Sequence, residues 1–346
     1  MKIAQLVHST DPRTGGVAKA VHDLANEFSK MGISHVTFDH PANEIKEGFD
    51  FIVSHGLWQW PGLHSLTLKK KRRIPYIVFP HGMLDPWFKK AYPFKHLKKQ
   101  FYWWWRQGKI LREAYAVCFT TEEERRLAQK TFLPYKCREK VTGLGTIDPP
   151  SNLEQSKGCF QKLFPQIEGK RILLYLGRLH PKKGLDTLLD AFHKLSSEKE
   201  ILVIAGPVDE KDPFHRKLKN KSIRLGDRVV WAGMLEGREK WGALGRADAL
   251  ILPSHQENYG MVVAEALSVG LPTYISNKVN LWREVINYKA GVVEDDSQEG
   301  IQKLVDTWIS SKVHLKHEDM LRCFNEKLHI NRSAKTILEL AENALS

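Results

Sequence analysis

Short apolar runs alternate along the chain with longer segments whose apolar residues recur at helical spacing. The runs have the length of buried strands, and most of them end in glycine or in a polar loop. Strands are predicted at 3–7, 49–56, 76–82, 114–120, 171–177, 201–207, 229–234, 249–252 and 273–275. Helices are predicted at 17–31, from 122 onward, and at 185–195, 241–246, 259–269 and 334–345. This alternation predicts parallel sheets, so the fold class is α/β, with two doubly wound, Rossmann-like domains facing across a cleft.

A stretch rich in proline, serine and asparagine, at 146–157, divides the pattern into two halves. It predicts an N-terminal domain at 1–149, a linker at 150–165 and a C-terminal domain at 166–330. The last helix, 331–346, is expected to pack back towards the N-terminal domain. A chain of 346 residues, 42% of them hydrophobic, is long enough to give each domain a full core.

The most informative polar motif follows the predicted strand at 249–252. A polar loop leads into a helix that Gly270 ends, and the free N–H groups of a helix start can bind an anion. Two carboxylates, Glu257 in the loop and Glu265 in the helix, flank this helix start. Carboxylates of this kind can accept hydrogen bonds from sugar or ribose hydroxyls. Taken alone, the pair also fits a capping carboxylate and a surface carboxylate.

Other polar loops stand at the ends of predicted strands, where parallel sheets bind ligands. Gly15-Gly16 follows the first strand, but it matches neither a dinucleotide fingerprint nor a phosphate-binding P-loop. His55-Gly56 and His81-Gly82 end two further strands, which exposes both histidines to a ligand. Arg178 and Lys183 lie in a basic loop after the strand at 171–177. Plain turns and surface charge are the alternative interpretations.

The net charge of +13 is concentrated in the first half. Residues 51–112 contain 13 lysines and arginines against one acid, Asp85. The segment 86–105 mixes these bases with aromatic residues, which suits an anionic membrane surface, a single-stranded nucleic acid, or a helix whose aromatic side chains fill the core. We expect the Trp104 side of this helix to be buried and its lysines to face outward.

Several classes of protein are excluded by what the sequence lacks. It contains no apolar run of 18 residues that could cross a membrane, and its first strand is too short for a signal peptide. The cysteines, Cys118, Cys137, Cys159 and Cys323, are too far apart in sequence for a zinc knuckle or a redox pair. The sequence therefore predicts a cytoplasmic protein with reduced thiols and no cofactor or metal. Through 69–105 it would attach peripherally to the inner face of the plasma membrane.

Taken together and in order, these motifs resemble the family-4 retaining glycosyltransferases of the GT-B fold, over nearly the whole chain. The resemblance rests on Gly15-Gly16-Val17, on Gly177-Arg178-Leu179 with Lys183-Gly184, on Ala205-Gly206, and on Glu257-x7-Glu265 with Tyr259-Gly260-Met261 between the carboxylates. Tyr259 stands where many members have Phe. The stretch 80–87 further resembles members from bacterial exopolysaccharide or envelope-polysaccharide synthesis.

The resemblance implies transfer of a hexose, with retention of configuration, from a nucleotide diphosphate sugar to a saccharide or lipid-linked saccharide. UDP-glucose is the first expectation for the donor, with UDP-galactose and GDP-mannose left open. Negative charge grows on the leaving phosphate, and Arg178 and Lys183 are suited to neutralise it. Because no Asp-x-Asp pair ends a strand, we expect this stabilisation to need no metal.

The resemblance also implies a role for each site residue. Glu265 is expected to accept both ribose hydroxyls, the backbone at Met234 and Leu235 to meet the base, and His81 to face the sugar. The expected catalytic residues are His81, Arg178, Lys183 and Glu257. The expected nucleotide- and sugar-binding residues are Gly15, Gly16, Met234, Leu235, Asn258, Tyr259, Gly260, Met261 and Glu265.

Two other functions compete with this interpretation. A nucleotide-sugar epimerase or a phosphorylase of the same fold would use the same residues for different chemistry. A basic nucleic-acid-binding protein would use the segment 86–105, but it would leave Glu257 and Glu265 unexplained, because carboxylates repel a phosphate backbone. The acceptor, the linkage and the oligomeric state are not indicated by the sequence.

Overall fold

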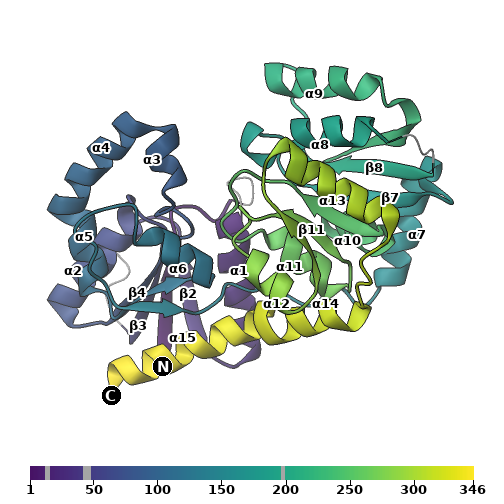
Figure 1. Cartoon of the computed structure of the whole chain (residues 1–346). Helices are drawn as coiled ribbons and strands as arrows, with labels where there is room; N and C mark the ends of the chain where they lie inside the picture. The colour runs from purple at the N-terminus through teal and green to yellow at the C-terminus, as the bar shows by residue number, and fades with distance from the viewer. Residues whose placement is uncertain (12–15, 42–47, 196–198) are drawn as a thin grey trace. The chain divides into compact units, whose positions relative to one another are not determined.

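The computed structural model describes residues 1–11, 16–41, 48–195 and 199–346 (Figure 1). The chain forms two compact units. The first contains Met1–Ile147 together with Leu328–Ser346, and the second contains Asp148–Lys327. The chain therefore leaves the first unit once and returns to it for its last helix.

The first unit is built on a parallel sheet with six strands in its described part, in the order β2-β1-β3-β4-β5-β6. The strands are β1 (Lys2–Leu6), β2 (Ser34–Phe38), β3 (Phe51–His55), β4 (Tyr76–Phe79), β5 (Ala116–Phe119) and β6 (Glu139–Val141). The helices are α1 (Gly16–Lys30), α2 (Trp60–Arg72), α3 (Trp87–Ala91), α4 (Pro93–Tyr102), the π-helical segment η2 (Trp103–Gln107), α5 (Gly108–Glu113), α6 (Glu122–Ala128) and α15 (Ile330–Leu345).

The second unit repeats this plan with the strand order β12-β11-β10-β7-β8-β9. The strands are β7 (Arg171–Leu176), β8 (Glu200–Ala205), β9 (Val229–Gly233), β10 (Ala249–Leu252), β11 (Thr273–Ser276) and β12 (Gly291–Glu294). The helices are α7 (Leu153–Leu163), α8 (Leu185–His193), α9 (Pro213–Ile223), α10 (Gly237–Arg246), α11 (Met261–Ser268), α12 (Trp282–Asn287), α13 (Gln298–Ser310) and α14 (His317–Cys323). Short helical turns are η3 (Pro165–Ile167), η4 (Pro181–Lys183), η5 (Gly226–Arg228) and η6 (Phe324–Leu328).

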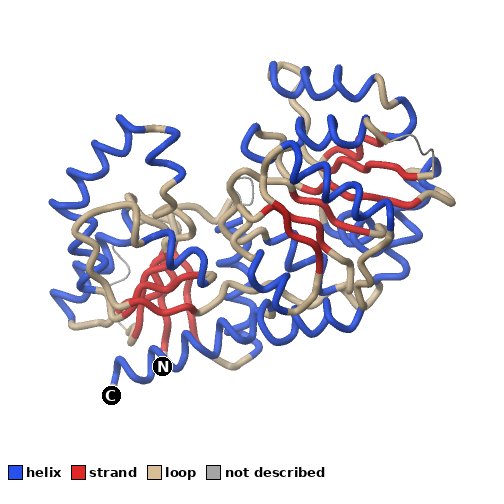
Figure 2. Tube along the Cα trace, in the orientation of Figure 1, coloured by secondary structure: helices blue, strands red, loops and turns tan. Residues whose placement is uncertain are grey.

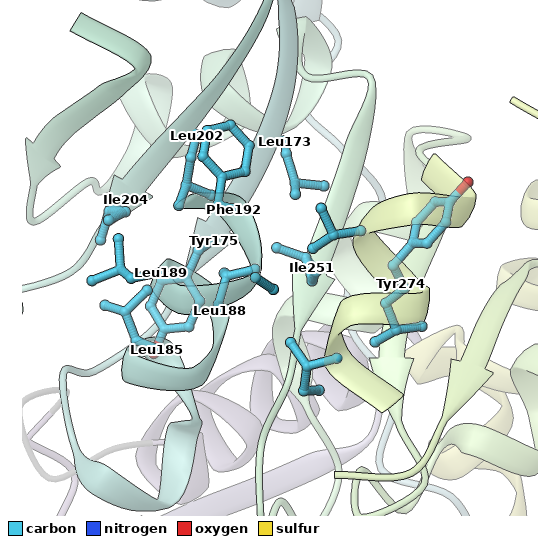
Figure 3. Close-up of a cluster of buried hydrophobic side chains, with 14 of the residues drawn as sticks. Leu173, Tyr175, Leu185, Leu188, Leu189, Phe192, Leu202, Ile204, Ile251 and Tyr274 are labelled. Carbon is cyan, nitrogen blue, oxygen red and sulfur yellow. The ribbon is translucent and has the colours of Figure 1, made fainter. Parts of the chain in front are cut away.

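Strands and helices alternate along both units, as the tube in Figure 2 shows, and the fold class predicted from the sequence is confirmed. The central strands are mostly apolar because helices cover both faces of each sheet, and the buried polar residues Gln5, Ser54 and His55 lie near the carboxyl ends of β1 and β3. In the second unit, alternate residues of β7 and β8, such as Leu173 and Leu202, pack against Leu188 and Phe192 of α8 (Figure 3).

The strand orders define where each sheet can bind a ligand. In the second unit, β8 and β9 are added on one side of β7, and β10 is later added on its other side. The connections that follow β7 and β10 therefore lead away from each other, although the two strands are neighbours. In the first unit β1 and β3 have the same relationship. At such a switch point the loops beyond the strand ends separate and leave room for a ligand.

The last helix completes the core of the first unit. Ile330, Ala334, Ile337 and Ala341 of α15 are fully buried in a cluster that also contains Phe28 and Phe51. The start of α15 approaches the backbone closely at Gly145, where a side-chain Cβ would lie 2.5 Å from the Cα of Ile330. Glycine is therefore required there, and α15 belongs structurally with residues far away in sequence.

The linker predicted at 150–165 is wrong, because most of it is the helix α7. Ser156 and Phe160 of this helix are buried against α10, where Gly242 allows the two backbones to approach. The Pro-rich composition that indicated a linker is confined to the few residues before α7. Three strands at or near the sheet edges, β2, β6 and β12, were also not predicted; none of them has a buried residue at any position.

The contact of α7 with α10 gives a test by paired glycine substitutions. Gly242→Ala should lower the free energy of unfolding by about 1–3 kcal/mol, because its methyl group would lie 2.3 Å from the carbonyl oxygen of Ser156. Gly158→Ala, on the exposed side of α7 with no neighbour within 4 Å, should instead raise it by roughly 0.5–1 kcal/mol. Urea unfolding of both variants checks the opposite signs. A loss at Gly158, or none at Gly242, would contradict this packing.

Candidate functional site

Two loops meet at the switch point of the second unit, one after β7 and one after β10. Gly184 adopts a left-handed conformation with φ of 67°, and a Cβ there would lie 2.1 Å from the carbonyl oxygen of Pro253. Beside this contact the backbone N–H of His255 donates to the carbonyl of Lys182 at 2.7 Å. The two loops are thus joined backbone to backbone, and the side chains that they carry are brought together.

Lys183 and Glu257 form an ion pair at this junction. Lys183 is almost fully buried, and burial lowers its pKa to about 7, with the charges of Lys182 and Arg178 acting in the same direction. The Glu257 carboxylate opposes that shift and favours the charged ammonium group. Glu257 is itself positioned by its backbone, which donates to the carbonyl of Lys278 at 3.0 Å and accepts from the N–H of Asn280 at 3.1 Å.

Arg178 lies at the start of the same basic loop, and its side chain is exposed. Its backbone carbonyl accepts a hydrogen bond from the hydroxyl of Tyr175 at 3.1 Å, which fixes the turn after β7. Within the described ranges its guanidinium group forms no ion pair with a carboxylate. Arg178 is therefore available for an anionic ligand, next to the buried charge of Lys183.

Glu265 is buried inside α11 and pairs with a residue that the sequence did not indicate. Lys240 of α10 places its Nζ 2.7 Å from Oε1 of Glu265, and the side chain of Glu265 is only 4% exposed. A buried carboxylate without a cationic partner would be costly, so Lys240 compensates its charge and orients it. No local spacing links the two positions, because they lie on different helices.

The start of α11 differs in detail from the expectation. The helix begins at Met261, and Gly260 before it is left-handed with φ of 76°. Tyr259 is buried, with 3% of its surface exposed, so its side chain packs inside the unit and does not face solvent. Asn258 approaches Asn280, with 3.5 Å between their amide nitrogen and oxygen. The N–H groups of Val263 and Ala264 donate to the carbonyl of Gly260, which leaves the N–H groups of Met261 and Val262 to face an anion.

The turn after β9 presents the two residues expected at the base. Met234 is 56% exposed, whereas the neighbouring Leu235 is buried. Gly233 is left-handed, and its carbonyl accepts a hydrogen bond from the N–H of Gly206 at 2.7 Å. The turn is therefore fixed to the end of β8 and carries one apolar side chain into solvent.

In the first unit the two strand-end histidines are in contact. Nδ1 of His55 lies 3.0 Å from Nε2 of His81, and the rings are stacked with centroids 5.3 Å apart. The other nitrogen of His55 lies 3.2 Å from Oε1 of Gln5. Burial lowers the pKa of His81 to about 4 and that of His55 well below its usual value. Both rings are therefore neutral near pH 7, and His55 and Gln5 orient His81.

A buried carboxylate holds the turn that carries His81. Glu124 accepts hydrogen bonds from the backbone N–H of Gly82 at 2.6 Å and from the N–H and hydroxyl of Thr120, each at 2.7 Å. This network keeps His81 in a left-handed conformation with φ of 50°, which is unusual for a residue other than glycine. The capping pattern Thr121-x-x-Glu124 was the sequence signal that could have pointed to Glu124.

The paired glycines after β1 are only partly described. Gly16 is the first residue of α1 and is exposed. Gly15 lies outside the described residues. The residues expected at the site are thus found at the carboxyl edges of two sheets, one in each unit.

The expectation for the basic-aromatic segment is wrong in its orientation. Trp103 is the buried tryptophan of η2, at 2% exposure, whereas Trp104 and Trp105 are 58% and 71% exposed. With three residues of α4 they form an exposed apolar stripe. We define the aromatic stripe as Phe94, Leu97, Phe101, Trp104 and Trp105. A helix spacing places all five on one side of the α4–η2 segment.

No helix among the described residues is long and apolar enough to span a membrane. No group of three or more His, Cys, Asp or Glu side chains among them is arranged to hold a metal ion.

Two strand-edge sites on doubly wound sheets define a ligand-binding α/β protein, and comparison with known families makes the class specific. A family model described as glycosyl transferases group 1 matches residues 161–325, within the second unit. A second model, glycosyl transferase 4-like domain, matches residues 45–138 in the first unit. The two matched segments therefore belong to the group 1 and 4-like glycosyltransferases, and the two units have the Rossmann-like sheets of the GT-B fold.

Individual relatives agree with this family. A glycogen synthase of Mycobacterium tuberculosis is 36% identical over 126 residues, which is 36% of this chain and 30% of that protein. An uncharacterised 41.2 kDa protein from the cps region of Klebsiella pneumoniae is 24% identical over 92% of this chain and 93% of its own. The crystal structure of Anabaena HepE in complex with UDP and glucose superposes with a TM-score of 0.78, at 16% identity, covering 99% of this chain and 100% of that one.

The buried histidine pair predicts how stability depends on pH. The unfolded chain binds protons at its histidines below about pH 6.5, whereas His81 in the folded unit resists protonation down to about pH 4. The unfolded state thus binds more protons in this window, so stability should fall as pH falls from about 6.5 to 4. Urea midpoints between these limits measure the loss. His81→Gln should flatten the dependence, and His22→Gln, at an exposed position of α1, should not. An unchanged slope in His81→Gln would contradict the neutral pair.

Proposed function

We propose that the chain is a retaining, metal-independent hexosyltransferase that moves a hexose from UDP-glucose to a saccharide or lipid-linked saccharide in polysaccharide synthesis. The observation that carries this proposal is the junction of the second unit, where Lys183, Glu257 and Arg178 gather beside the start of α11. HepE, a structural neighbour, has been solved with UDP-glucose, which supports this donor over UDP-galactose and GDP-mannose. The cps-region relative supports the pathway.

The leaving group is a nucleoside diphosphate, and its departure places negative charge on the terminal phosphate. Arg178 and Lys183 supply two cations at the strand edge, and the first N–H groups of α11 add hydrogen-bond donors. Because Lys183 is already buried and held by Glu257, little reorganisation is needed when the charge develops. These groups do the work for which other transferases use a divalent cation.

The remaining residues bind the donor. Glu265, oriented by Lys240, accepts hydrogen bonds from the ribose hydroxyls, and the turn at Met234 and Leu235 contacts the base. Glu257 lies on the sugar side of the diphosphate, with the loop 258–261. In the first unit, neutral His81 offers a hydrogen bond to a sugar hydroxyl, and Gly15 and Gly16 allow the backbone to approach the ligand.

The aromatic stripe and the lysines around it support attachment to an anionic membrane. The stripe would enter the lipid interface while the exposed lysines contact anionic headgroups, each contributing about 1 kcal/mol. Sedimentation with phosphatidylglycerol vesicles at low salt should therefore retain the protein. Changing Phe101, Trp104 and Trp105 together to Ser should abolish retention, and unchanged pelleting would exclude this surface.

The direct test is product analysis with a panel of donors. Incubation with UDP-glucose, UDP-galactose and GDP-mannose in a detergent extract of polysaccharide-producing bacteria should release UDP from the first and form an α-linked hexose. Activity should persist in EDTA. Loss of activity in EDTA that Mn²⁺ restores would refute metal independence. An epimerised nucleotide sugar, or products formed only with inorganic phosphate, would identify one of the alternative enzymes.

The phosphate role gives a mutational prediction. Arg178→Ala and Lys183→Ala should each lower kcat by roughly 10²- to 10³-fold, the scale for loss of one donor to a developing anion. The exposed residues Arg224 and Lys162 serve as matched controls, and their Ala variants should retain full turnover. Circular dichroism would show that Lys183→Ala, which leaves Glu257 without its partner, is still folded. Wild-type kcat in either site variant would refute the assignment.

A further inference from the structure

A pocket of about 310 Å³ lies within the first unit, and neither strand-end histidine is among its lining residues. It is enclosed by α3, α4 and the turn after α6, and Figure 1 shows α3 and α4 as a helical pair standing clear of the sheet. Its lining residues are Met83, Phe88, Tyr92, Lys95, His96, Lys99, Thr131 and Phe132. The volume is at the lower end of the range of about 300–1,000 Å³ that is typical of ligand pockets.

Two lysines share this pocket without a carboxylate. In the described part of the chain neither Lys95 nor Lys99 forms an ion pair, and the surrounding residues 51–112 contain one acid, Asp85. Instead, the two ammonium groups rest on aromatic rings: Lys99 lies 4.9 Å from the ring centroid of Trp58, and Lys95 lies 5.1 Å from that of Tyr92. Burial lowers the pKa of Lys99, and the charge of Lys95 lowers it further. An anion between the two would relieve this repulsion.

The other walls of the pocket are apolar and rigid. The ring of Phe132 stacks on Trp103 at 5.1 Å and on His96 at 4.6 Å. The turn that carries Phe132 is fixed to α4 and η2, because the side chains of Gln100 and Trp104 both donate to the carbonyl of Leu133 at 2.6 Å. The pocket is therefore formed before any ligand arrives, with cations on one side and aromatic rings on the other.

The helix α4 divides its surface between this pocket and the aromatic stripe. Tyr92, Lys95, His96 and Lys99 recur at helical spacing on one side, and residues of the stripe occupy the opposite side. A helix lying on a membrane through its stripe would thus hold the pocket just above the lipid surface. An anion with a phosphate for the lysines and an apolar chain for the aromatic rings fits this arrangement.

We infer that this pocket binds the phosphate group of a phosphorylated amphiphile, with Lys95 and Lys99 on the phosphate and the rings of Phe88, Tyr92 and Phe132 against the start of its apolar chain. Lysine is a point charge suited to phosphate oxygens, and the aromatic walls discriminate against a free phosphate ion. The inference rests on the proposed function only in that such an amphiphile would carry the acceptor saccharide.

The test is equilibrium binding of farnesyl phosphate, with farnesol and inorganic phosphate as comparison ligands. Farnesyl phosphate should bind with a stoichiometry of one, and each comparison ligand at least about tenfold more weakly, because each lacks one half of the recognised group. In the double variant Lys95→Gln/Lys99→Gln the affinity should fall by about 10- to 100-fold, as expected for loss of hydrogen bonds to a charged group. Lys95→Arg/Lys99→Arg should retain most of it.

A matched control separates the pocket from general electrostatic attraction. Lys90→Gln/Lys98→Gln removes the same charge from the neighbouring helices α3 and α4, but neither residue lines the pocket. This variant should bind farnesyl phosphate within about threefold of wild type, since exposed charges are screened. Equal weakening in both double variants would overturn the inference, as would equal affinity for inorganic phosphate, which would mean a soluble phosphate. Binding only to phosphatidylglycerol vesicles, with no effect of Lys95 and Lys99, would overturn it in favour of the membrane surface alone.

The donor site provides an independent readout in the same samples. A thermal shift with UDP-glucose reports on the second unit and should be the same in all the lysine variants. If wild-type protein shows the thermal shift with UDP-glucose but does not bind farnesyl phosphate, the pocket inference alone is refuted. Absence of the shift with intact farnesyl phosphate binding refutes the proposed donor and leaves the pocket standing.

Discussion

The approach of two loop backbones, at Gly184 and Pro253, is the constraint on which the candidate site of the second unit depends. Any side chain at position 184 would occupy the place of the Pro253 carbonyl and force the loops apart. Because β7 and β10 are neighbours, their loops start only one strand spacing apart, and the glycine lets them touch. Lys183 and Glu257 meet as a consequence of this backbone contact.

In the second unit, the acidic side chains of the candidate site form ion pairs with lysines. Each carboxylate of the motif has its own lysine, Lys183 for the half-buried Glu257 and Lys240 for the buried Glu265. Each acidic group is therefore paired with a cation of its own unit, whereas Arg178 forms no ion pair within the described residues. The first unit solves the same problem differently, since His55 and His81 are kept neutral by burial and oriented by hydrogen bonds. One unit thus presents cations at its strand ends, and the other presents neutral imidazole rings.

The periodic pattern of the sequence was sufficient for the central strands and the fold class, because those strands are apolar on both faces. The same pattern did not predict the edge strands, which have no buried positions, or the contacts between helices that are distant in sequence. The edge strand β2, with no buried residue, has no apolar run to detect. Glu257 and Glu265 were visible as a spaced pair, but Lys240 was not, since only the packing of α10 against α11 brings it to Glu265. Likewise, the run Trp103-Trp104-Trp105 could not show which ring is buried, because that depends on the π-helical turn η2 and its neighbours.

Because α15 returns to the first unit, the two units differ in how they could be exchanged by recombination. The second unit is one continuous segment, 148–327, whereas the first is assembled from two segments, Met1–Ile147 and Leu328–Ser346. A single recombination event between two such genes would join a foreign α15 to the surface that Phe28 and Phe51 provide, and the contact at Gly145 leaves no slack for a mismatch. Exchange of the second unit between relatives therefore requires two crossovers, one near each boundary, so that the segment 148–327 is inherited as an insert while the first unit keeps its own closing helix.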